Sequence, residues 1–214
     1  MRIIKAGYEI MDNLNGMDIL KKIELCGRVC YKSEEKMSEE TAERFVRGII
    51  KQGHESVLEH VSFTIRFIVD RGVSHELVRH RIASFSQEST RYCNYGHENE
   101  ITVIEPLFWA YCIDDDSFAE AERLYQLWRM SCMVTEDTYL ELLKLGRPPQ
   151  EARSALPNSL KTEVIMTANL REWRHFFKLR TAKAAHPQMR EVTIPLLTEL
   201  QTLIPVIFDD IGGC

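Results

Sequence analysis

Long apolar runs are missing from this sequence, and this absence argues against a membrane protein. No stretch approaches the ~18 apolar residues that a membrane-spanning helix needs. The first residues, Met1–Lys5, lack the apolar segment of a signal peptide. We therefore expect a cytoplasmic protein with no membrane partner. None of the six cysteines forms a CxxC pair, so zinc-ribbon and thioredoxin-like sites are not expected.

Several short ligand-binding motifs are absent as well. The sequence contains neither GxGxxG nor GxxxxGK[ST], the glycine-rich loops that hold phosphates through backbone N–H groups. It also lacks the GxSxG nucleophile motif and the HExxH pair of metal ligands, and we expect no bound metal. Any phosphate must then be held by side chains, for which the forked guanidinium of arginine is well suited.

Charge is unevenly distributed along the chain. The 214 residues carry a net charge of -5, which does not favour non-specific binding to nucleic acid. Residues 79–91 nevertheless hold three arginines against Glu88, and residues 171–190 hold six lysines or arginines against Glu172. An acidic protein with two basic segments indicates a localised anionic ligand, although such charges can also serve only to solvate helix surfaces.

Hydrophobic patterning predicts a single α+β domain over residues 1–214, with a small, mostly antiparallel sheet flanked by long helices. Alternating apolar and polar residues predict two strands, at 60–67 and 160–167. The polar, turn-rich stretch 82–100 is typical of a functional loop. Helical spacing predicts helices at residues 15–31, 38–53, 117–145, 169–180 and 187–208. Asn169 is expected to cap the helix that ends at Arg180.

Polar and positively charged side chains are concentrated in the segment Arg79–Tyr92. Its arginines cannot all be buried without anionic partners. Its serines, Thr90 and Gln87 add further hydrogen-bonding groups, so the segment suits a phosphorylated ligand. The tripeptide Arg79-His80-Arg81 alone is more often structural, but its spacing of seven residues to Ser89 is much more specific.

The run from Arg79 to Ser89 resembles the signature of the flavin-dependent thymidylate synthase family, in which RHR is followed by seven residues and a serine. Gly53–Ser56 resembles the stretch that precedes the family's first long strand. Further similar segments follow in the family's order, at Glu151–Pro157, Asn169–Arg171 and Leu179–Arg180. Together these segments cover most of residues 50–190.

The resemblance implies a homotetrameric enzyme that carries out the reductive methylation of dUMP to dTMP. 5,10-Methylenetetrahydrofolate would supply the one-carbon unit and reduced FAD (FADH2) the hydride, and NADPH would re-reduce the flavin. FAD would contact Ser56, Arg79, His80, Arg81, Gln87, Asn169, Arg171 and His175. The nucleotide would contact Glu76, Arg79, Gln87, Glu88, Ser89, Arg91, Arg153 and Arg180.

The resemblance also implies the catalytic role of Arg180, which would activate the uracil by favouring ionisation at N3. A guanidinium stays charged, and it stabilises a nearby anion more strongly where water is excluded. Two residues depart from the family pattern. Glu76 stands where several members carry glutamine, and the long spacing after Arg180 leaves His186 without a role.

Other interpretations of single residues remain open. Cys93 is a candidate for the attacking thiolate of the flavin-independent thymidylate synthases, although no base is evident nearby. Ser89 is more readily a nucleotide-binding hydroxyl than a nucleophile, for the same reason. His54 is a candidate folate or flavin contact, and His60, at a strand start, is better explained as a packed residue.

Two other functions compete with the flavin enzyme. One is a metal-dependent phosphohydrolase acting on a nucleotide, with ligands drawn from His54, His60, His75 and His80 and nearby carboxylates. The other is a non-catalytic module that binds RNA or DNA through the basic segments. The net charge and the lack of aromatic residues interleaved with the arginines count against the second function.

Overall fold

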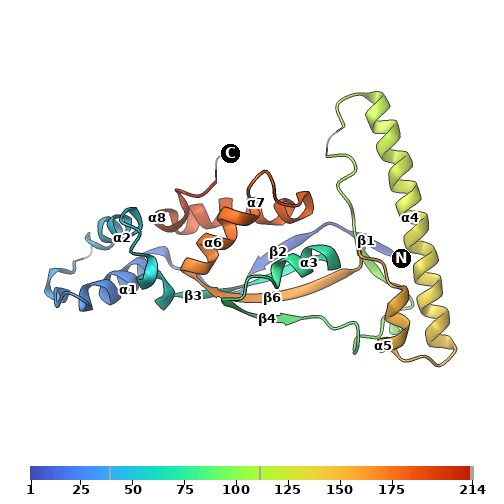
Figure 1. Ribbon diagram of the computed structural model, residues 1–214, viewed down its shortest axis with the longest axis horizontal. Helices are drawn as coiled ribbons and strands as arrows, with labels where there is room; N and C mark the ends of the chain where they lie inside the picture. The colour runs from blue at the N-terminus through green and yellow to red at the C-terminus, as the bar shows by residue number, and fades with distance from the viewer. Residues whose placement is uncertain (39, 111, 213–214) are drawn as a thin grey trace. The chain divides into compact units, whose positions relative to one another are not determined.

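The computed structural model describes residues 1–38, 40–110 and 112–212. The chain, drawn as a ribbon in Figure 1, divides into two compact units, and each unit combines three segments of the sequence. Unit 1 consists of Met1–Gly7, Ile68–Leu77 and Ser86–Val164, and unit 2 of Tyr8–Phe67, Val78–Phe85 and Ile165–Cys214. Within the described ranges, no helix combines the length and the apolar character that crossing a membrane requires.

Four strands form one sheet, in the order β2 (Gly7–Ile10), β3 (Ser62–Asp70), β6 (Lys161–Asn169) and β4 (Ala83–Gln87). Thr64 lies opposite Thr167, with their hydroxyl oxygens 2.9 Å apart. Leu170 lies opposite Val61 and donates its N–H to the Val61 carbonyl. The residue numbers rise along β3 as they fall along β6, so these two strands are antiparallel. The predicted α+β class with a small, mostly antiparallel sheet is confirmed.

Alternating burial in β3 explains the pattern seen in the sequence. Within unit 2 this strand buries three apolar side chains on one face: Phe63, Ile65 and Phe67. Helix α6 (Leu170–Arg180) packs against them through Trp173, whose ring stacks on Phe63 with centroids 5.0 Å apart. The Trp173 indole N–H also donates to the Phe63 carbonyl at 3.2 Å. These contacts fix helix α6 against strand β3.

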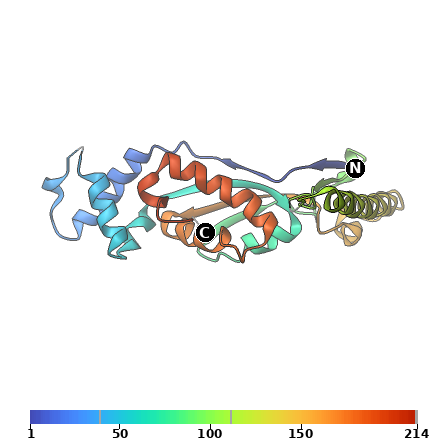
Figure 2. The ribbon, with the colours of Figure 1, turned by 90° about the horizontal axis from the view of Figure 1, so that it is seen from above.

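The remaining helical elements of unit 2 are α1 (Gly16–Val29), α2 (Ala42–Lys51), α7 (Pro187–Leu203), α8 (Pro205–Phe208) and the 3-10 segments Glu34–Lys36 and Glu55–His60. Helix α1 packs against α2, and α7 packs against α6 and α8 (Figures 1 and 2). The segment Glu55–His60 also packs against α6. The predicted helix 187–208 is interrupted at Ile204, because Pro205 lacks an N–H and starts a new short helix.

Unit 1 is built around the long helix α4 (Asp115–Lys144). Its start is fixed by a capping box, in which Asp114 accepts the Ser117 N–H at 2.8 Å and the Ser117 hydroxyl accepts the Asp114 N–H at 3.0 Å. The other elements are the parallel strands β1 (Arg2–Ile4) and β5 (Thr102–Ile104), helices α3 (Arg71–Leu77) and α5 (Pro149–Ala152), and the 3-10 segments Tyr95–His97 and Arg153–Ala155. Its core contains Ile101, Val103, Cys132, Tyr139, Ala152 and Leu160.

The stretch 82–100 differs from the predicted loop. Strand β4 occupies Ala83–Gln87, and a 3-10 turn occupies Tyr95–His97. Strand β4 lies at the end of the strand order, where it pairs on one side only, and its sequence Ala-Ser-Phe-Ser-Gln has no β-branched residue. Its strand conformation therefore depends on pairing with β6, which composition alone does not reveal.

Candidate active site

Helix α6 presents two chemically different faces. Its cap is Asn169, whose side-chain oxygen accepts the Glu172 N–H at 2.9 Å, as the sequence predicted. The buried face carries large aromatic side chains: Trp173, Phe176 and Phe177. The exposed face carries basic or titratable side chains: Arg171, His175 and Lys178. The helix is thus anchored by one face, and its other face is open to solvent.

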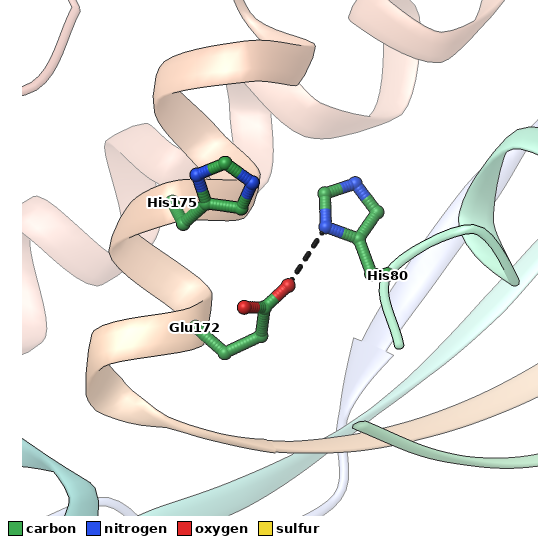
Figure 3. A group of neighbouring side chains, drawn as sticks. All are labelled: His80, Glu172 and His175. Atoms are coloured by element: carbon green, nitrogen blue, oxygen red, sulfur yellow. Dashed lines mark hydrogen bonds and ion pairs between the residues drawn. The ribbon is translucent and has the colours of Figure 1, made fainter. Parts of the chain in front are cut away.

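His80 connects the first turn of α6 to its last residue. Its Nδ1 lies 2.9 Å from Glu172 Oε1 (Figure 3), and its Nε2 accepts a hydrogen bond from Arg180 Nε at 3.1 Å. His80 is 4% exposed and Glu172 is 7% exposed. Both ring nitrogens of His80 are therefore engaged in a place that water hardly reaches.

These two bonds determine where the proton of His80 lies. Arginine has only hydrogen-bond donors, so Nε2 must supply a lone pair and the ring proton must sit on Nδ1, where it is donated to Glu172. Burial lowers the pKa of His80; the hydrogen bond to Glu172 opposes this shift, and the charge of Arg180 adds to it. The imidazole is therefore neutral at neutral pH.

A metal ion is a poor fit to the same group. The ligand atoms of His80, Glu172 and His175 all lie within 4.8 Å of one another, close enough to hold an ion (Figure 3). Because Nε2 is occupied by Arg180, an ion would need the lone pair of Nδ1, which carries the proton donated to Glu172. The histidines His54, His60 and His75, on which the phosphohydrolase hypothesis relied, do not belong to this group.

A cavity of about 500 Å³ opens in unit 2, within the ~300–1,000 Å³ typical of ligand pockets. It is lined by Glu55, Glu59, Ile82, Asn169, Arg171, Glu172, His175 and Lys178. Three residues expected to bind FAD thus lie around one cavity: Asn169, Arg171 and His175. Arg171 pairs with Glu59 at 2.6 Å, but these side chains are 54% and 45% exposed, so an anionic ligand can displace the pair at little cost.

A second cavity, of about 600 Å³, lies in unit 1 and is lined by residues that include Arg71, Thr90 and Arg153. Arg153 Nη1 is 3.5 Å from the Thr90 hydroxyl, and Arg71 Nη1 is 3.5 Å from the Thr162 hydroxyl. Both distances are at the outer limit of a hydrogen bond. Guanidinium groups held this loosely can turn to an anion such as a phosphate.

Two further residues of unit 1 that were predicted to contact a ligand, Gln87 and Glu88, have side chains that already make hydrogen bonds within the protein. The Gln87 side-chain amide donates to the Ser74 hydroxyl at 2.9 Å and to Thr162 at 3.3 Å. The Glu88 carboxylate accepts from the Tyr95 hydroxyl at 2.7 Å and from Lys161 Nζ at 3.0 Å. Burial, together with the bond to Glu88, raises the pKa of Tyr95 above its usual range, so this phenol stays protonated as a donor.

The remaining predicted residues are mostly at the surface. Three of them in unit 2 are exposed to solvent: Ser56, Arg79 and Arg81. His186 is also exposed, at the start of α7. In unit 1, Arg91 and Arg153 are exposed, whereas Glu76 and Ser89 are half-buried. The prediction that His60 is packed is wrong, because β3 begins only at Ser62 and His60 ends the preceding 3-10 segment, exposed to solvent.

Several residues that line these cavities were not singled out from the sequence, and Glu172 and Arg71 are the two most informative. Glu172 is the one acidic residue in the basic segment 171–190. An isolated acidic residue in such a segment indicates a specific partner. Arg71 directly follows strand β3, where a side chain at a strand end is well placed to reach a ligand.

Known proteins resemble this chain over most of its length. The family described as "Thymidylate synthase complementing protein" matches residues 14–206. The flavin-dependent thymidylate synthase of Geobacter sulfurreducens is 36% identical over 200 residues, which cover 90% of this chain and 82% of the relative. That of Pyrococcus furiosus is 38% identical over 176 residues, covering 81% and 68%.

The fold is also found in a solved structure. A UMP/dUMP methylase, PolB from Streptomyces cacaoi, bound with 5-Br dUMP, superposes with a TM-score of 0.79 at 24% identity, covering 98% of this chain and 96% of that one. The likeness extends over both units. The family match and the curated relatives confirm the prediction made from Arg79–Ser89: this chain belongs to the flavin-dependent thymidylate synthase family.

Proposed function

We propose that this chain catalyses the reductive methylation of dUMP to dTMP in the cytoplasm. 5,10-Methylenetetrahydrofolate donates the one-carbon unit, and NADPH is the reductant of the flavin. Family membership supports this reaction, and so does the fold shared with a methylase that was solved with a dUMP analogue. The observation that carries the proposal is the grouping on α6: residues of this helix line a cavity, and its last residue, Arg180, is held at its Nε by a buried, neutral histidine.

We expect the cavity of unit 2 to hold part of a flavin dinucleotide, because the three carboxylates in its lining, Glu55, Glu59 and Glu172, are each paired with a side chain of α6 or with His80. Arg171 and Lys178 supply positive charge for the diphosphate, and Asn169 and His175 supply polar groups for heteroatoms. Ile82 adds an apolar contact in the same lining. The proposed FAD contacts are Ser56, Arg79, His80, Arg81, Gln87, Asn169, Arg171 and His175. When bound and reduced, FAD supplies the hydride for the reaction.

The site must bind both the phosphate and the base of the nucleotide. Arg153, with Arg71 beside the same cavity, is a suitable partner for the phosphate because both guanidinium groups are only loosely bonded. The proposed nucleotide contacts are Glu76, Arg79, Gln87, Glu88, Ser89, Arg91, Arg153 and Arg180. Of these, Glu88 has its carboxylate bonded to Lys161 and Tyr95. Its contact is therefore expected at the backbone carbonyl, which accepts only a long bond from Arg71, at 3.4 Å.

Arg180 is the proposed catalytic residue. The N3–H of uracil is a weak acid, and a guanidinium placed against the ring stabilises the anion formed when that proton leaves. The anionic ring is a better nucleophile at C5, where the one-carbon unit must be attached. Arginine suits this role because its guanidinium group stays charged.

The two units are proposed to be parts of one domain that spans residues 1–214. Each unit is assembled from three alternating segments, and strands β3 and β6 contribute residues to both. Sequential domains would instead occupy separate stretches of the chain. The family match over residues 14–206 also runs through both units without a break.

A homotetramer is proposed on the basis of the family resemblance and of an apolar stripe on α4. Five large apolar side chains between residues 124 and 134 of this helix are 41% to 65% exposed: Leu124, Leu127, Met130, Met133 and Val134. Their spacing of three to four residues places most of them along one side of the helix. Apolar patches of this kind on a soluble protein usually mark an interface.

The stripe predicts the effect of introducing charge. Replacing Leu127 and Val134 together with glutamate should convert the assembly to smaller species, because two carboxylates would be buried without partners. Light scattering coupled to size-exclusion chromatography measures the mass. Val29→Glu on α1 is the matched control, since Val29 is similarly exposed, at 55%. An unchanged tetramer in the double variant would place the interface elsewhere.

The reaction itself can be tested with dUMP tritiated at C5. Tritium should appear in water only when FAD, NADPH and 5,10-methylenetetrahydrofolate are all present, and the purified protein should bind FAD and turn yellow. Full flavin occupancy without turnover would contradict the proposed reaction. A stoichiometric divalent ion and no flavin would favour the phosphohydrolase instead.

A further inference from the structure

The proposed catalytic arginine is held by a buried chain of two other side chains. Arg180 Nε donates to His80 Nε2 at 3.1 Å, and His80 Nδ1 lies 2.9 Å from the Glu172 carboxylate. Glu172 and Arg180 are eight residues apart on the same helix, whereas His80 comes from the segment that follows α3. His80 therefore bridges two turns of α6 from outside the helix.

The surroundings leave the His80 ring little freedom. It makes an edge-to-face contact with the buried Phe176 ring, with centroids 4.9 Å apart and planes at 65°. His175 lies on another side, with centroids 5.8 Å apart. Glu172 is held in turn by its backbone N–H, which donates to the Asn169 cap. The rigid end of α6 thus fixes the ring that meets Arg180.

We propose that Glu172 and His80 are positioning residues that align the Arg180 guanidinium for its work on the uracil. The inference rests on the proposed catalytic function of Arg180 and adds two residues that act through it. A long arginine side chain loses rotamer freedom when it is held in one place, and this loss costs free energy. Part of that cost is met on folding if His80 holds Nε before the substrate arrives.

The identity of the partner matters as much as its position. A carboxylate bonded directly to Nε would orient Arg180 but would also oppose the charge needed to stabilise the uracil anion. The neutral imidazole of His80 orients the guanidinium without cancelling charge through that bond. Glu172 keeps the imidazole in the required tautomer, with the proton on Nδ1 and the lone pair facing Arg180.

This role differs from the cofactor contact expected for His80 from the family resemblance. Both nitrogens of its ring are already bonded within unit 2, so a side-chain bond to FAD would require releasing Glu172 or Arg180. Contact between the His80 backbone and the flavin is compatible with the proposal. The side chain, however, is assigned to Arg180.

Two substitutions at position 80 separate positioning from packing. His80→Phe keeps a ring of similar shape but has no acceptor for Arg180, and we expect its kcat to fall about 100-fold, as for a catalytic group displaced by about 1 Å. His80→Gln changes the shape more but can place its amide oxygen near the Nε2 position, and it should stay within about tenfold of wild type. A residue needed only for packing would give the opposite order.

A double-substitution cycle tests whether His80 acts through Arg180. In an Arg180→Ala background, His80→Phe should cause no further loss of turnover, because there is no guanidinium left to align. Flavin content is measured on every variant. Loss of bound FAD in both position-80 variants would identify His80 as a cofactor ligand and overturn the proposal, as would wild-type kcat in His80→Phe.

Glu172→Gln provides an independent test, because it replaces only one carboxylate oxygen with an amide nitrogen. The amide can bond Nδ1 in either direction, so the tautomer is no longer fixed, and we expect kcat to fall about tenfold with little change in KM for dUMP. Glu24→Gln is the matched control: Glu24 is fully buried and bonded to Arg28 at 2.6 Å, on helix α1. It should lower stability but not the turnover per bound flavin.

The failure of this inference is distinct from the failure of the proposed function. If Arg180→Ala is fully active, Arg180 is not catalytic and the basis of the inference is lost. If Arg180→Ala is inactive while His80→Phe and Glu172→Gln both turn over like wild type, the proposed role of Arg180 stands. The positioning role is then wrong.

Discussion

Arg180→Ala is expected to lower the rate of dTMP formation by about 10³-fold or more while leaving FAD bound. Removing one preorganised group that stabilises developing charge commonly costs about 10²–10³ in kcat. Arg180 also carries a full charge, so the loss should lie at or above the upper end of that range. Bound flavin should persist because the cavity lining of unit 2 does not include Arg180. Single-turnover assays with pre-reduced protein measure the step directly.

This experiment needs a control variant that loses a positively charged side chain outside the site. Arg44→Ala removes an exposed arginine from α2, outside both cavity linings, and should leave turnover unchanged. Arg180→Lys is informative as well, because lysine keeps the charge but lacks the planar fork, and it should recover only part of the activity. Turnover of Arg180→Ala at the wild-type rate would remove this residue from the mechanism.

Arg79→Ala is expected to weaken the binding of both FAD and dUMP. Arg79 is exposed, and its neighbour His80 is buried and bonded at both nitrogens, so the backbone that carries Arg79 is anchored beside α6. Loss of one charge-assisted hydrogen bond commonly costs about 1.5–3 kcal/mol, which corresponds to about 10- to 150-fold in affinity. Titration calorimetry with each ligand separately measures both constants.

Arg81→Ala is the matched control for this effect. Arg81 belongs to the same tripeptide and is also exposed, but it is proposed to contact FAD only. Its replacement should weaken FAD binding and leave the affinity of the flavin-loaded protein for dUMP close to wild type. If Arg79→Ala changed only one of the two affinities, Arg79 would not be shared between the ligands.

Much of the fold could be predicted, because the apolar residues on the buried face of a strand or helix recur in the sequence with the period of that element. Strand β3 was predicted at 60–67 and lies at Ser62–Asp70; the alternation identified the buried face but not the ends. Helix α4, predicted at 117–145, begins at Asp115 because the cap is Asp114. Strand β4 was missed since its polar residues owe their conformation to pairing with β6, a contact between distant parts of the chain.

The residues of the candidate site could be predicted from the sequence, but the contacts between them could not. The spacing from Arg79 to Ser89 identified the family, and Asn169, Arg171 and His175 lie around one cavity as neighbours on a helix should. The bond between His80 and Glu172 joins residues 92 positions apart, and no local pattern encodes it. A buried carboxylate in a basic segment is a clue to such a bond, but its partner becomes visible only in the folded chain.

The most direct test of the central claim is a crystal structure of the assembled protein with FAD and dUMP. We expect the flavin to contact Asn169, Arg171 and His175, and the uracil to lie within hydrogen-bonding distance of the Arg180 guanidinium while His80 still accepts from its Nε. A uracil ring bound away from Arg180, or a flavin that leaves the cavity of unit 2 empty, would contradict this account.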